Sequence, residues 1–60
     1  MRILRMRELT QVTGLSRSTI YRFIRMGTFP KQISLGENSS GWRSDEIYAW
    51  IKEKEELRER

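Results

Sequence analysis

The feature that most constrains this chain is residues 13–27, which read TGLSRSTIYRFIRMG. Gly14 reaches the left-handed backbone conformation at low cost and can end one helix, and Gly27 can end the next one in the same way. Ser16 is a favourable N-cap because its hydroxyl accepts a hydrogen bond from a free backbone N–H of the first turn. Leu15 would fill the gap between the two helices. The stretch therefore predicts the turn and second helix of a helix-turn-helix.

The helix predicted after this turn has two chemically different faces. Apolar side chains recur at i, i+3 and i+4 on one face, which suits packing. These are Ile20, Phe23 and Ile24. The same spacing places Ser18, Tyr21, Arg22 and Arg25 on another face. Hydroxyl, phenol and guanidinium groups are what a helix in the DNA major groove presents, so we expect a recognition helix over about residues 17–26.

Length and composition limit the chain to a single small domain over residues 1–60. A chain this short buries roughly 60% of its unfolded surface, so its stability is marginal. The sequence contains no Cys and no His, which argues against disulfides and against a zinc site of the usual kind. No apolar run approaches the ~20 residues that cross a bilayer, and the basic N-terminus lacks the apolar segment of a signal peptide. We expect no membrane partner.

The positive charge is concentrated in the part of the chain that holds the recognition helix. The formal net charge is +4. Residues 1–43 carry eight Lys and Arg against Glu8 and Glu37, whereas residues 44–60 carry four against six acids. The first part is thus net +6 and the second net −2, as expected for a polyanion-binding face. A solvated basic surface without a partner is the alternative interpretation.

The N-terminal segments complete the first half of the fold. Residues 1–6 are expected to form an extended lead-in whose apolar side chains cover the core, and residues 7–13 a short first helix. Leu9 and Val12 are spaced i, i+3 and would face inward. After the recognition helix, Pro30 ends the helical pattern because proline fixes its own φ and biases the preceding residue toward an extended conformation.

A β-hairpin, or wing, is expected over about residues 31–43. Residues 31–35 alternate polar and apolar side chains with the period of a strand, residues 36–40 are turn formers, and residues 41–43 can pair back. Two strands alone are barely stable, so the hairpin must pack on the helices. The candidates for that packing are Phe29, Ile33, Leu35 and Trp42.

The last helix is expected to begin at Ser44, whose hydroxyl would cap it, and two acids follow that suit the positive helix N-terminus. Ile47, Trp50 and Ile51 are spaced i, i+3, i+4 and should close the core. The charged tail 52–60 indicates a solvated helix end. The predicted fold class is mainly α with a small β-hairpin, in the order helix, helix, hairpin, helix, which is a winged helix-turn-helix.

Three blocks of sequence carry a family resemblance: residues 13–22, residues 27–31, and residues 41–44 followed by Glu46-Ile47 and Trp50-Ile51. In them the chain resembles the AlpA family of small phage and prophage transcriptional regulators, a branch of the MerR-like winged helices related in fold to excisionases. The resemblance covers about Ile3 to Lys54. It implies an intracellular, bacterial, nucleoid-associated DNA-binding regulator that often acts on genes governing integration or excision.

The chain departs from the family pattern at the tip of the wing. Family members carry basic residues there, whereas this chain has Glu37-Asn38-Ser39-Ser40. The departure argues against strong phosphate or minor-groove binding by the tip. Contacts with the DNA backbone remain open to four other hairpin positions. These are Lys31, Gln32, Ser40 and Arg43.

The candidate DNA-binding residues lie on the recognition helix and the hairpin. They are Arg17, Ser18, Thr19, Tyr21, Arg22, Arg25, Lys31 and Arg43. Residues near the N-terminal end of a recognition helix usually reach base edges, so Arg17, Ser18 and Tyr21 are the candidates for reading sequence. Arg22 and Arg25 lie further along and are expected to bind phosphates.

Several of these positions have simpler interpretations. The arginines could be a solvated helix surface, and Tyr21 could pack against the wing. Thr19 can donate to a phosphate, and Arg43 should be exposed because successive strand residues point to opposite faces and Trp42 points inward. Trp42 and Trp50 could stack on bases in a single-strand binder, but their positions favour the core.

The leading hypothesis is a sequence-specific double-stranded DNA-binding transcriptional regulator, bound alone or with a second protomer, another regulator or a recombinase. An excisionase-like architectural factor that bends DNA would use the same surface. A protein adaptor without DNA binding is the third interpretation. An enzyme is not expected, since there is no His or Cys and no glycine-rich phosphate loop. We expect no cofactor, metal or small-molecule ligand.

Overall fold

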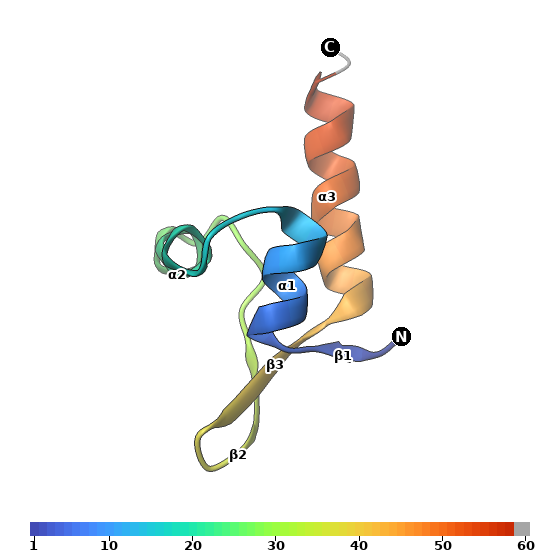
Figure 1. Cartoon of the computed structure of the whole chain (residues 1–60). Coiled ribbons are helices and arrows are strands. Elements are labelled where there is room, and N and C mark those ends of the chain that lie inside the picture. Colours follow the sequence, from blue (N-terminus) through green and yellow to red (C-terminus); the bar gives the residue numbers. More distant parts are fainter. Residues whose placement is uncertain (59–60) are drawn as a thin grey trace.

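The computed structural model describes residues 1–58, which form three helices and a small antiparallel sheet (Figure 1). The predicted order of helix, helix, hairpin and helix is confirmed, and one strand precedes it. In chain order the elements are β1 (Ile3–Leu4), α1 (Met6–Thr13), α2 (Arg17–Met26), β2 (Ile33–Gly36), β3 (Ser39–Arg43) and α3 (Ser44–Arg58).

The caps predicted for the helix-turn-helix are confirmed. Gly14 has a left-handed φ of 73° after α1, and its N–H donates to the Thr10 carbonyl at 2.9 Å. Ser16 caps α2, because its hydroxyl accepts from the Thr19 backbone N–H at 3.2 Å. Gly27, with φ 77°, ends α2. These short-range interactions set the bounds of the helix that carries most of the candidate residues.

Substitution of Ser16 tests whether its hydroxyl stabilises the start of α2. Ser16→Ala removes the acceptor for the Thr19 N–H, and we expect it to lower the free energy of unfolding by about 1 kcal/mol. Ser18→Ala is the matched control, because Ser18 is exposed in the same turn and caps nothing. Urea denaturation followed by circular dichroism measures both. Equal effects of the two variants would contradict the capping role.

The sheet has three antiparallel strands in the order β1-β3-β2, so the prediction of a two-stranded hairpin was incomplete. In the register of β1 and β3, Ile3 pairs with Arg43 and Leu4 with Trp42. The lead-in is therefore extended, as predicted, and Leu4 is fully buried. The pairing partners of β1, Trp42 and Arg43, lie far along the sequence, so no local pattern could identify them.

The hairpin turn is tighter than predicted. Turn residues are confined to Glu37 and Asn38, and the predicted turn formers Ser39 and Ser40 belong to β3. Asn38 adopts a left-handed φ of 57°, a conformation that asparagine tolerates in turns. The register shifts between Ser34 and Gly36 as β2 approaches this turn. Ladder pairing thus extends into a segment whose composition alone favours a loop.

The core joins all the helices to the base of the hairpin. Its buried members are Leu4, Leu9, Ile20, Phe29, Trp42 and Ile47. Trp42 is 1% exposed, and its indole N–H donates to the Pro30 carbonyl at 3.1 Å. Among the four candidates for anchoring the hairpin, Phe29 and Trp42 are buried, whereas Ile33 and Leu35 are exposed. The hairpin is therefore fixed at its base, and its distal part projects from the body (Figure 1).

The first two turns of α3 close the core, with one difference from prediction. Ile47 is fully buried, but Trp50 and Ile51 are partly buried and pack against the core. The Trp50 indole N–H donates to the Thr28 carbonyl at 2.7 Å, and its ring meets Phe29 edge-on at a centroid distance of 4.8 Å. Trp50 therefore fastens α3 to the loop after α2.

The expectation that Ser44 caps α3 was wrong. Its hydroxyl instead accepts from the Arg2 backbone N–H at 2.8 Å, and its own N–H donates to the Arg2 carbonyl. The reason is that β3 runs directly into α3, so Ser44 is the first helical residue and is buried against β1. Of the tail 52–60, residues 52–58 continue α3 and are exposed, and residues 59 and 60 lie outside the described part.

Candidate nucleic-acid interface

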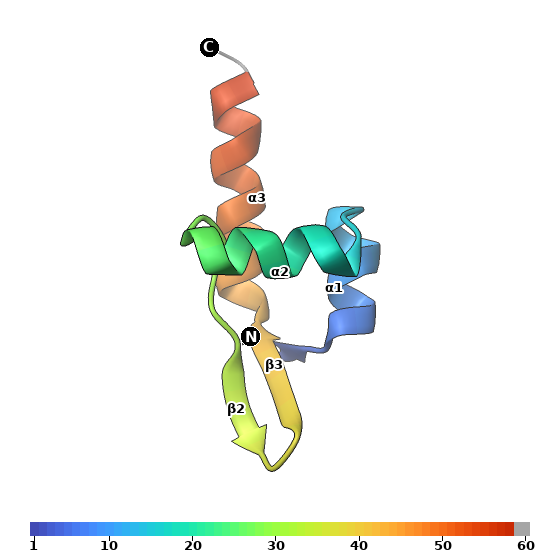
Figure 2. The same cartoon turned by 90° about the vertical axis from the view of Figure 1, so that its left-hand side faces the viewer.

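The outward face of α2 collects most of the candidate residues. Packing of Ile20 against the core directs Arg17, Ser18, Arg22 and Arg25 into solvent. Tyr21 on the same helix is 38% exposed. Figure 2 looks onto this side, where α2 lies across the front of the molecule and no other labelled helix or strand passes in front of it. The two faces predicted from the residue spacing are therefore present.

Thr19 sits at the first turn of α2 and is half-buried. Its hydroxyl oxygen accepts a hydrogen bond from the Ser16 hydroxyl at 2.9 Å. Because the oxygen acts as the acceptor in this bond, its own hydrogen stays available to donate outward. The Ser16 hydroxyl therefore caps α2, and the Thr19 hydroxyl can donate a hydrogen bond to a ligand at the start of the helix.

The charges of α2 are not neutralised by acidic residues of the described part of the chain, residues 1–58. Over residues 1–58, ion pairs engage Arg2 with Glu8 at 2.7 Å and Arg43 with Asp45 at 2.9 Å, and none engages a basic residue of α2. Lys31, exposed just after the helix, also has no ion pair in this range. An uncompensated cationic surface of this kind attracts polyanions.

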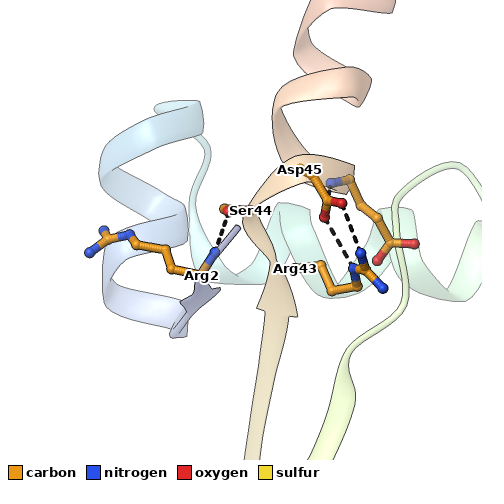
Figure 3. Close-up of polar contacts among 5 residues, drawn as sticks. Arg2, Arg43, Ser44 and Asp45 are labelled. Carbon is orange, nitrogen blue, oxygen red and sulfur yellow. Dashed lines mark hydrogen bonds and ion pairs between the residues drawn. The ribbon is translucent and has the colours of Figure 1, made fainter.

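Arg43 is exposed as predicted but is held by an acid. Its Nε and Nη2 atoms donate to the two Asp45 carboxylate oxygens at 3.1 and 2.9 Å (Figure 3). This hydrogen-bonded pair raises the pKa of Arg43 and lowers the pKa of Asp45. Arg43 also lies on the face of β3 opposite the buried Trp42. The structure therefore does not group Arg43 with the side chains of α2.

Two other kinds of site, a metal centre and a membrane span, were sought in the described chain. Within residues 1–58, no three Cys, His, Asp or Glu side chains come together in a way that could hold a metal ion. No helix in this range is long and apolar enough to cross a membrane. Most of the candidate residues lie on the basic face of α2.

Comparison with known proteins finds relatives whose sequences match most of this chain. The chain is 50% identical over 50 residues to the uncharacterized protein ORF88 of Enterobacteria phage P4. The matched segment covers 83% of this chain and 57% of that protein, so the chain spans less than two thirds of the length of this relative. It is 39% identical over 59 residues to the DNA-binding transcriptional activator AlpA of Escherichia coli (strain K12), covering 88% of this chain and 84% of that protein.

A family model gives the same assignment. The model for the prophage CP4-57 regulatory protein (AlpA) matches residues 2–55, which include β1, the helix-turn-helix, the hairpin and the packed turns of α3. The match and the two relatives agree with the resemblance noted from the three sequence blocks. The chain belongs to the AlpA family of phage regulatory proteins.

Proposed function

We propose that this chain is a sequence-specific double-stranded DNA-binding transcriptional regulator of the phage type. The observation that carries the proposal is the exposed basic face of α2, whose arginines have no acidic partner in residues 1–58. The printed description of the E. coli relative, a DNA-binding transcriptional activator, supports it. On this proposal the chain acts in the bacterial cytoplasm on nucleoid DNA, without catalytic activity.

The proposed docking places α2 in the major groove, in the manner of MerR-like and excisionase-like winged helices. Arg17, Ser18 and Tyr21 would then face base edges, and Arg22, Arg25 and the hydroxyl of Thr19 would contact phosphates. Lys31 would extend the phosphate contacts toward the hairpin. We leave Arg43 outside this interface because Asp45 balances its charge and its side chain lies on the other face of β3.

An architectural role is the second candidate. A single module of this size buries little surface on DNA, about 600–1,000 Å² for comparable domains, so useful affinity favours several protomers on adjacent sites. An excisionase-like factor would bend the DNA as the protomers fill those sites. Counting protomers per site and measuring the bend by gel mobility separates this role from that of a simple regulator.

The central experiment is selection of bound duplexes from a random pool, followed by titration at several salt concentrations. A DNA-binding regulator should yield a defined site and an affinity that falls with salt, because phosphate contacts release counterions. The selected site would also show its symmetry and spacing. An affinity indifferent to salt, or no affinity for any duplex, would contradict the proposal and favour a protein adaptor.

Arg17 provides a residue-level test of base reading. A guanidinium that bonds guanine O6 and N7 gives about 1–3 kcal/mol of discrimination, and Arg17 is exposed at the start of α2. Arg17→Ala is therefore expected to relax the preference at one or two base pairs by roughly 5- to 150-fold. Repeating the selection with the variant measures this change. An unaltered selected site would show that Arg17 does not read bases.

A further inference from the structure

An open groove of about 550 Å³ lies between the loop that follows α2 and one face of α3. Figure 2 shows this loop passing beside α3 after the end of α2. Residues 27–30 line the groove on the side of the loop. On the side of α3, the lining includes Glu46, Trp50, Glu53 and Lys54. None of the candidate DNA-binding residues lines it, so the groove is a surface separate from the basic face of α2.

Two carboxylates lie along the α3 side of the groove. Glu46 and Glu53 are seven residues apart, which is nearly two helical turns, so they share one face of α3 with a rise of about 10 Å between them. Both residues are exposed, and within residues 1–58 neither carboxylate takes part in an ion pair. In the described chain these two negative charges are therefore not balanced, and they can receive a cation from another molecule.

Aromatic rings line the groove between the two acids. Phe29 and Trp50 meet edge-on at a centroid distance of 4.8 Å, and Trp50 is only partly buried. The ammonium of Lys54 lies 5.3 Å from the centroid of the Trp50 ring. A cation in this position is attracted by the negative face of the ring. The contact with Lys54 shows that this ring is open to a positively charged group.

The end of α2 adds a third feature that favours positive charge. Gly27 ends the helix and lines the groove together with Thr28. The C-terminal end of a helix carries partial negative charge on its free carbonyl groups, which stabilises cations. Carboxylates, an aromatic ring and a helix C-terminus thus all favour a cationic ligand, and the same groups disfavour a phosphate.

We propose that this groove binds an arginine-bearing segment of a partner protein. A guanidinium lies against the Trp50 ring and donates hydrogen bonds to Glu46 or Glu53. Arginine suits this site better than lysine, because its planar guanidinium stacks on aromatic rings and matches a carboxylate with two parallel hydrogen bonds. The two acids lie on either side of Trp50 along α3, so a segment with two arginines can pair with both of them.

Lys54 is the internal competitor for this site. Its ammonium already lies over the Trp50 ring that the partner's guanidinium would cover. Binding of the segment therefore displaces Lys54 into solvent, and the lost contact lowers the affinity. Removal of the Lys54 charge should consequently strengthen binding, which is the opposite of what a purely structural role of Lys54 predicts.

The test titrates isotope-labelled protein with a short capped peptide that carries two arginines, followed by nuclear magnetic resonance. The signals of the Trp50 indole N–H and of the Glu46 and Glu53 amides should move, whereas the amides of the hairpin turn should not. The same peptide with lysines should bind roughly threefold more weakly, because it loses the stacking and the paired hydrogen bonds. No DNA is present, so the result does not depend on the proposed function.

A pair of charge variants tests the two acids. Glu46→Gln/Glu53→Gln keeps the size of both side chains and should weaken binding of the arginine peptide roughly fivefold, because exposed ion pairs are individually weak. Glu55→Gln/Glu56→Gln is the matched control, since it removes the same charge from exposed positions of α3 that do not line the groove. We expect the control to bind the peptide nearly as well as the wild type.

Lys54→Gln tests the aromatic contact, and Trp50 itself is left unchanged because it also holds α3 to the loop. This variant should bind the arginine peptide roughly two- to fivefold more tightly than the wild type. An affinity that stays the same or falls would show that the guanidinium does not take the place of Lys54 on the ring, and it would contradict the proposal.

Other outcomes would also overturn the site. Absence of signal changes at millimolar peptide would show that the groove does not bind arginine. Equal affinities for the arginine and lysine peptides, or equal losses in the two glutamate pairs, would indicate attraction by net charge alone. A wild-type dimer in sedimentation that Glu46→Gln/Glu53→Gln dissociates would identify a second copy of this chain as the occupant, and the assignment to a partner protein would be wrong. Each of these results leaves DNA binding by α2 to its own experiment.

Discussion

Trp42→Ala is expected to leave most of the chain unfolded at room temperature. Trp42 is 1% exposed at the centre of the sheet, and its indole N–H bonds the Pro30 carbonyl. Large-to-small changes of a buried aromatic cost about 3–5 kcal/mol. A domain of this length has roughly 3–9 kcal/mol of stability in total. The substitution should therefore remove most of the free energy of unfolding, and circular dichroism melting measures the loss.

The control for this prediction is Tyr48→Ala. Tyr48 is an aromatic residue of α3 with 53% of its surface exposed, so its removal opens no cavity and should change stability by less than about 0.5 kcal/mol. A Trp42→Ala variant that melts cooperatively within a few degrees of the wild type would refute the assignment of Trp42 as the centre of the core.

The second large effect is expected from the double variant Arg22→Gln/Arg25→Gln. Both side chains are exposed on α2 and free of ion pairs within residues 1–58. Each phosphate contact adds about 0.9 to the slope of log affinity against log salt. Loss of two contacts should therefore reduce the slope by roughly 1.8 and weaken binding to every duplex by roughly 60-fold at 0.1 M salt. Fluorescence anisotropy at several salt concentrations measures both quantities.

Arg43→Gln is the matched control, since it removes the same charge from a residue that Asp45 already pairs. We expect no change of slope from it. A change as large as that of one α2 arginine would instead restore the sequence-based prediction that Arg43 contacts phosphate. If the double variant keeps the wild-type slope, Arg22 and Arg25 do not contact phosphate, and the proposed docking of α2 is wrong.

Local interactions explain which parts of the fold could be predicted. The ends of α2 depend on Ser16 and Gly27, which act on residues within one helical turn. The two faces of α2 depend on a spacing of three and four residues, which the sequence displays directly. The candidate residues of this helix could therefore be named, and their exposure confirms the division into a packed and a free face.

Interactions between distant residues explain what was missed. Serine is a residue type that commonly caps helices. The Ser44 hydroxyl instead accepts a hydrogen bond from the Arg2 backbone N–H, because the N-terminal segment lies beside the end of β3. Arg43 was expected to be free, but the direct passage from β3 into α3 brings Asp45 against its guanidinium. The alternation of residues 31–35 predicted a strand, but the pairing of Ser34 with Ser40 depends on a turn of only two residues.

By itself, the sequence determined the helix-turn-helix, the basic character of α2 and the family, because caps, periodicity and motif blocks act or recur over short distances. Only the tertiary structure decided that β1 completes the sheet, that Arg43 is paired with Asp45, and that Trp42 of β3 packs in one core with Ile20 of α2. These features depend on which distant segments pack together. Packing of distant segments reflects the free energy of the whole core, which no short window of sequence contains.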